Sequence, residues 1–80
     1  MSIYVANLSE EVQEYDLKQI FSKYGSVIEV RLPKCRQSGE NRGFAFVEME
    51  TDAEEAAAIY SLLGTEYMGH NLKINKVLQR

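Results

Sequence analysis

The stretch RGFAFVEME, residues 42–50, has the two-residue alternation of a β-strand with two different faces. Two glutamates fall on the same face as two phenylalanines. Because glutamates are rarely buried without partners, this face should be the one in contact with water. Aromatic side chains left at the surface of so small a chain suggest a binding function. The water-facing residues are Phe44, Phe46, Glu48 and Glu50, and the opposite face carries Ala45, Val47 and Met49.

Three other segments share this alternation and are predicted to be strands. The polar segment 34–41 contains a glycine and is expected to join two of the strands as a long hairpin loop. Residues 65–71 form a short turn region, which could be a small hairpin. The three additional strands are residues 2–8, 26–33 and 71–77.

Two segments have the three- and four-residue spacing of a helix with one buried stripe. The first, residues 14–24, is followed by Gly25, a common helix stop. The second begins at Thr51 with the capping-box pattern TDAE and ends at Gly64. Its buried stripe is predicted to be Ala58, Ile59 and Leu62.

The resulting order of elements is β-α-β-β-α-β within one domain of 80 residues. With right-handed crossovers, this order gives a four-stranded antiparallel sheet packed on two helices, the ferredoxin-like α+β arrangement. Both helices then cover the same face of the sheet, and the other face is left open. That open face is predicted to carry Tyr4, Glu29, Arg31, Phe44, Phe46, Glu48, Lys73 and Asn75.

Charge and composition restrict the function classes. The net charge of −3 counts against a nucleic-acid partner, but the acidic residues gather in or beside the predicted helices, away from most basic residues. One cysteine and one histidine leave no basis for a disulfide, a multi-cysteine metal site or a histidine-based catalytic site. No segment has the pattern of a signal peptide or a membrane span, so we expect a cytoplasmic protein. The basic residues outside the helices are Arg31, Lys34, Arg36, Arg42, Lys73, Lys76 and Arg80.

The aromatic residues of two strands should meet in the middle of the open face. The first and third strands are the central pair in this topology, which places Tyr4 beside Phe44 and Phe46. Bases of single-stranded nucleic acid stack on such rings at about 1–3 kcal/mol each, and nearby cations meet the phosphates. The sequence therefore predicts a platform for single-stranded nucleic acid, flanked by Arg31, Arg42 and Lys73.

Two motifs carry a family resemblance. IYVANL, residues 3–8, resembles the RNP2 motif, and RGFAFVEM, residues 42–49, resembles the RNP1 motif of the RNA recognition motif (RRM) family. Along its whole length the chain is similar to the short single-domain RNA-binding proteins of bacteria, above all cyanobacteria. The resemblance implies a single RRM domain over residues 1–80 that binds single-stranded RNA and acts in post-transcriptional regulation.

The resemblance also implies roles for individual residues. Tyr4 would stack on one base and Phe44 on a second, while Phe46 would pack against a sugar or between nucleotides. Arg42 would pair with a phosphate, and Gly43 would allow close approach of the backbone. Single-stranded DNA could use the same platform, and no cofactor is implied. The implied secondary contacts are Arg31, Lys73, Asn75 and Lys76.

Other aromatic and reactive residues have simpler interpretations. Cys35 and His70 are expected to be incidental surface residues of a loop and a turn. Tyr15, Tyr60 and Tyr67 are expected to pack at the edge of the core.

Two rival function classes differ in how well they fit. Small ferredoxin-like enzymes such as acylphosphatases need a phosphate-cradling loop with an arginine, whereas the loop NLSEEVQEY, residues 7–15, is acidic and lacks arginine and glycine. No nucleophile–base pair is apparent either, so we expect no enzymatic activity. The alternative that stays open is a protein–protein interaction or self-association module that uses the same aromatic face. We expect a monomer.

Overall fold

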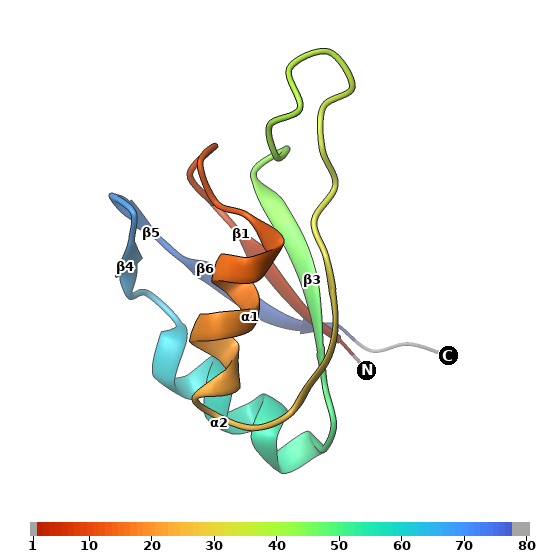
Figure 1. Cartoon of the computed structure of the whole chain (residues 1–80). Helices are drawn as coiled ribbons and strands as arrows, with labels where there is room; N and C mark the ends of the chain where they lie inside the picture. The colour runs from red at the N-terminus through yellow and green to blue at the C-terminus, as the bar shows by residue number, and fades with distance from the viewer. Residues whose placement is uncertain (1, 78–80) are drawn as a thin grey trace.

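The computed structural model describes residues 2–77 of the chain. The main sheet consists of β1 (Ser2–Ala6), β2 (Val27–Arg31), β3 (Phe44–Met49) and β6 (Lys73–Val77), and the helices are α1 (Glu14–Ser22) and α2 (Asp52–Leu62). The strand order is β2-β3-β1-β6, with each neighbouring pair antiparallel. Both helices lie on one side of this sheet (Figure 1). The predicted ferredoxin-like arrangement and its central strand pair are therefore confirmed.

The core lies between the sheet and the two helices. Alternation along β1 and β3 sends every second side chain into it, and α1 contributes the fully buried Leu17 and Phe21. Burying a large apolar side chain such as Leu17 or Phe21 stabilises the folded state by roughly 1.5–3 kcal/mol. The core thereby holds the opposite, open face of the central strands in a fixed shape. The buried residues of the two central strands that face the helices are Ile3, Val5, Ala45, Val47 and Met49.

Strand β2 departs from simple alternation at a β-bulge. The pairing register with β3 shifts between Val27 and Glu29, so that Val27 lies opposite Met49 and the intervening Ile28 is 57% exposed. A bulge inserts one extra residue and resets which side chains face the partner layer. After the bulge, Glu29 and Arg31 occupy the open face, as predicted. The strand is shorter than the predicted range 26–33.

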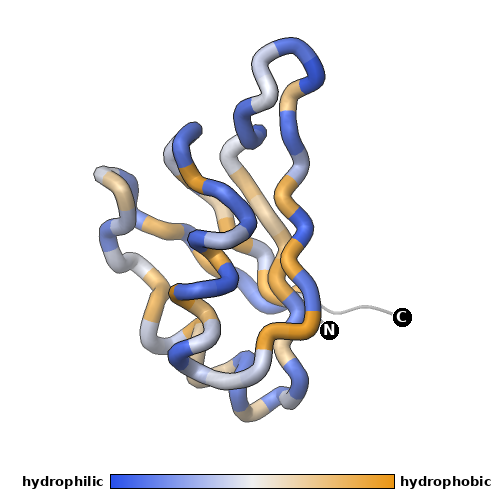
Figure 2. Tube along the Cα trace, in the orientation of Figure 1, coloured by the Kyte–Doolittle hydropathy of each residue, from blue (hydrophilic) through white to orange (hydrophobic). Residues whose placement is uncertain are grey.

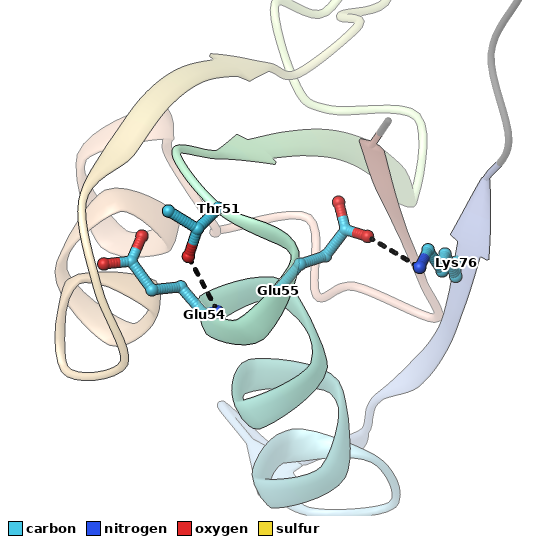
Figure 3. Close-up of polar contacts among 4 residues, drawn as sticks. All are labelled: Thr51, Glu54, Glu55 and Lys76. Carbon is cyan, nitrogen blue, oxygen red and sulfur yellow. Dashed lines mark hydrogen bonds and ion pairs between the residues drawn. The ribbon is translucent and has the colours of Figure 1, made fainter.

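The two helices begin with different side-chain caps. In α1, the backbone N–H of Gln13 donates to a carboxylate oxygen of Asp16 at 2.8 Å. In α2, the hydroxyl of Thr51 accepts from the N–H of Glu54 at 3.1 Å (Figure 3), which is one half of the predicted capping box. The Glu54 carboxylate does not complete the box, because it accepts instead from the N–H of Ser26 at 3.3 Å. This contact ties α2 to the start of β2.

Gly25 marks the turn after α1, although the helix ends at Ser22, two residues earlier than predicted. Its φ of +152° is a conformation that glycine adopts readily and other residues rarely do. A Cβ atom at this position would also collide with the side chain of Glu54. The glycine is therefore required both by backbone conformation and by the close packing of α2.

The turn region before the last strand forms a small hairpin of β4 (Glu66–Tyr67) and β5 (His70–Asn71). Tyr67 packs against the core, as expected. Tyr15 and Tyr60 do not, since they are 67% and 89% exposed on the helices. No helix among the described residues has both the length and the apolar content needed to cross a membrane.

Candidate nucleic-acid interface

Three aromatic side chains meet at the centre of the open face. Tyr4 on β1 lies directly opposite Phe46 on β3. Two residues further along the same strands, Phe44 lies opposite Ala6. The ring centroids are 5.5 Å apart for Tyr4 and Phe46, 6.1 Å for Tyr4 and Phe44, and 6.0 Å for Phe44 and Phe46. We refer to Tyr4, Phe44 and Phe46 as the aromatic triad.

The triad is held by the central strands rather than by loops. Each ring is half-buried, and the residues that follow Tyr4 and Phe44 along the strands, Val5 and Ala45, are completely buried in the core. The rings are tilted by 38° and 48° in the pairs that involve Tyr4, and the two phenylalanines meet edge to face at 83°. Such tilted and edge-to-face contacts are the favourable geometries for aromatic pairs. The rings therefore form a surface organised before any ligand arrives.

Polar residues extend the triad toward both edges of the sheet. Arg31 on β2 pairs with Phe46, and Asn75 on β6 pairs with Tyr4, so that one row across the sheet is Arg31–Phe46–Tyr4–Asn75. In the neighbouring row, Lys73 of β6 lies beside Ala6. Arg31, Lys73 and Asn75 are all exposed. The structure thus brings these three predicted contacts to the triad.

Arg42 stands at the start of β3, where the hairpin loop returns to the sheet. It is exposed, and its backbone N–H donates to the carbonyl of Pro33 at 3.1 Å. The next residue, Gly43, has a φ of +92°, which favours glycine and turns the chain into the strand. Its N–H donates to the side-chain oxygen of Asn41 at 2.7 Å. Arg42 is thereby placed at the end of the sheet next to Phe44.

Lys76 is not brought to the triad. It pairs with Ile3, and its side chain therefore lies on the face covered by the helices, where its Nζ is 3.7 Å from an oxygen of Glu55 (Figure 3). The reason is the two-residue period of a strand, because Lys76 has the same parity as the buried Ile74. That parity was readable in the sequence. Of the other basic residues, Arg80 lies outside the described part of the chain.

Glu55 is the main buried residue that the sequence analysis missed. It is 2% exposed in α2, and its Oε1 has no hydrogen bond among the described residues, so the ion pair with Lys76 is its compensating contact. Helical spacing could have revealed it, since Glu55 precedes Ala58 by three residues and Leu62 by seven. The stripe was otherwise right, with Ala58 buried and Ile59 and Leu62 partly buried.

The hairpin loop between β2 and β3 is mainly hydrophilic and extends away from the body of the domain (Figures 1 and 2). Within it, the backbone N–H groups of Ser38 and Gln37, and then the Ser38 hydroxyl, hydrogen-bond the sulfur of Cys35 and lower its pKa. Arg42 lowers this pKa further, by a smaller amount. Between residues 2 and 77, no three His, Cys, Asp or Glu side chains are grouped so as to hold a metal ion.

Comparison with known proteins agrees with this geometry. Residues 3–73 match the RNA recognition motif family. The candidate RNA-binding protein RbpA of Synechocystis sp. is 58% identical over 80 residues, which cover 100% of this chain and 79% of that protein. The crystal structure of the RNA-binding protein PG1 is 40% identical, with a TM-score of 0.92 over 100% of this chain and 96% of that chain.

A solved Sxl-lethal protein/RNA complex is also similar. It is 30% identical, with a TM-score of 0.87 over 92% of this chain and 46% of that one. The family match extends over both motifs that supply the triad, and the relatives are named for RNA binding and not for any enzymatic activity. The chain therefore belongs to the RNA recognition motif family, a family of RNA-binding domains.

Proposed function

We propose that the protein binds single-stranded RNA on the open face of its sheet, with bases stacked on the aromatic triad. The observation that carries the proposal is the mutual contact of three half-buried rings on the two central strands, with centroids 5.5 to 6.1 Å apart. Aromatic stacking is worth roughly 1–3 kcal/mol per base and accepts every base. Membership of the RRM family and the RNA complex of a relative support RNA as the ligand.

Each contact has a proposed role. Tyr4 stacks on one base and Phe44 on a second, while Phe46 packs against a sugar or between nucleotides. Arg42 pairs with a phosphate at the loop end of the sheet. Lys76 is left out of the proposed contacts because of its place on the helix-covered face. The secondary contacts are Arg31, Lys73 and Asn75.

The proposed cellular role is post-transcriptional regulation in the cytoplasm, by analogy with the named relatives. Single-stranded DNA could occupy the same rings. Contacts to the 2′-hydroxyl groups would then separate RNA from DNA.

Titration of fluorescent single-stranded RNA octamers tests the proposal. The double variant Phe44→Ala/Phe46→Ala should lose about 2–6 kcal/mol of binding free energy, the sum of two stacking losses. Tyr60→Ala is the matched control, because Tyr60 is 89% exposed on α2 and lies away from the open face. Equal RNA affinities of the wild type and the double variant would rule out the stacking platform, provided that circular dichroism shows both proteins to be folded.

A protein interaction or self-association module on the same face is the second candidate, since an exposed aromatic surface also suits a protein partner. The dependence of binding affinity on salt concentration distinguishes the two candidate functions. An RNA complex with two or three phosphate contacts should lose affinity with a log–log slope of about −1.4 to −2.1. A buried apolar interface should respond little to salt. Sedimentation of the free protein, for which we expect a monomer, tests self-association directly.

A further inference from the structure

Glu48 lies next to the aromatic triad on the open face of the sheet. It follows Phe46 by two residues on β3 and shares its face of the sheet, at a separation of about 7 Å along the strand. Its side chain is half-buried. Within residues 2–77, no hydrogen bond or ion pair engages its carboxylate. The acid is therefore free to contact a ligand that lies over the rings.

The position of Glu48 is electrostatically unusual. Glu29 of β2 lies directly opposite Glu48, whereas the next pair on the same face of these two strands is Arg31 with Phe46. Like charges directly opposite each other destabilise an antiparallel pair. The two neighbouring carboxylates of Glu29 and Glu48 also repel the phosphates of a nucleic acid. A bound strand should therefore place its phosphates near Arg31, Arg42 and Lys73, and should turn base edges, not phosphates, toward Glu48.

The other polar groups around the triad have different chemistry. Arginine and lysine side chains only donate hydrogen bonds, and the Asn75 amide both donates and accepts. An ionised carboxylate only accepts, through two oxygens. Glu48 is thus suited to hydrogen-bond the N–H groups of a base that stacks on Tyr4, which lies opposite Phe46. Proteins hydrogen-bond the edges of splayed, stacked bases in single-stranded RNA in this way.

We infer that Glu48 sets the base preference of this face, with guanine bound most tightly and uracil least. The inference rests on the proposed function. Guanine offers N1–H and N2–H side by side, which two carboxylate oxygens accept as a bidentate pair. Cytosine and adenine offer one exocyclic amino group. Uracil presents a single N–H between two carbonyl oxygens, and these repel the carboxylate.

The test compares an all-uridine octamer with the same octamer carrying one central guanosine. The wild type should bind the guanosine octamer at least about fivefold more tightly, the lower end of the discrimination given by a bidentate contact. Glu48→Gln should reduce this ratio to less than twofold without weakening the binding of oligouridine, because the amide can donate to a uracil oxygen. Glu66→Gln removes the same charge from β4, outside the main sheet, and should keep the full ratio.

The outcomes distinguish the inference from the proposed function. An unchanged guanosine preference in Glu48→Gln, or no such preference in the wild type, would overturn the inference alone, since binding to the octamers would persist. A folded wild-type protein that binds neither octamer would overturn both.

Discussion

Lys73 and Lys76 lie on the same strand, β6, but on opposite faces of the sheet. Lys73 pairs with Ala6 and faces the same side as the triad, whereas Lys76 pairs with Ile3 and reaches Glu55. The two lysines therefore have different expected roles, although the sequence analysis predicted both to be RNA contacts. The two-residue period of the strand therefore places a proposed RNA contact and an ion pair on opposite faces of β6.

Exchanging each lysine for methionine should separate these roles. Lys76→Met leaves the carboxylate of Glu55 without its partner and should lower the free energy of unfolding by about 1–3 kcal/mol, between the values for exposed and buried ion pairs. RNA affinity should change little. Lys73→Met should leave stability unchanged and reduce the log–log salt slope of RNA binding by about 0.7. Urea denaturation and RNA titration of both variants measure the two effects, and a loss of salt slope in Lys76→Met would contradict the assignment.

At the scale of elements, Asn41 connects the β2–β3 hairpin loop to the loop between β1 and α1. Its side-chain N–H groups donate to the carbonyls of Ser9 at 2.7 Å and Val12 at 3.1 Å, and its oxygen accepts from Gly43 at 2.7 Å. The residue is almost completely buried. These bonds fix the point at which the loop enters β3, and with it the position of Arg42.

Asn41→Ala should therefore destabilise the domain. Removing the side chain leaves the Val12 carbonyl and the Gly43 N–H without partners, whereas the Ser9 carbonyl still accepts from the N–H of Val12. We therefore expect a loss of about 2–3 kcal/mol in the free energy of unfolding. Asn75→Ala, at an exposed position on β6, should change it by less than about 0.5 kcal/mol. Urea unfolding curves test this, and equal effects of the two substitutions would show that the loop anchor contributes nothing.

The same loop should make Cys35 more reactive than an unstructured cysteine. Because hydrogen bonds from Ser38 and Gln37 lower the pKa of its thiol, more thiolate is present at any given pH in the folded loop. The rate of alkylation by iodoacetamide should therefore reach half its maximum at a lower pH in the folded protein than in urea. Ser38→Ala should raise that midpoint. A midpoint that is the same in the folded and unfolded protein would contradict the proposed hydrogen bonding.

The sequence predicted most elements because their periodicity is local. The alternation of residues 42–50 correctly assigned both faces of β3, and the spacing in 51–64 located α2 within two residues at its end. What escaped prediction depends on pairing between segments. The bulge at Ile28 is set by the register of β2 against β3, and the hydrogen bond from Ser26 to Glu54 requires two segments 28 residues apart in the sequence to meet in space.

At the scale of the whole molecule, the two-layer arrangement explains how an acidic protein can offer a nucleic-acid platform. The helices carry much of the acid on the covered side, while the central strands present rings and the sheet edges present Arg31 and Lys73. The separation of charge is incomplete, because Glu29 and Glu48 share the open face. Net charge alone was therefore a poor guide, whereas the placement of the aromatic triad followed from alternation and topology together.

The most direct test of this platform is an NMR titration of the wild-type protein with a single-stranded RNA octamer, followed through amide and aromatic resonances. We expect the largest shift changes at Tyr4, Phe44 and Phe46 and at their neighbours on β1 and β3, with the outer faces of α1 and α2 unaffected. Changes concentrated on the helices, with the three rings unperturbed, would contradict RNA binding by the open face.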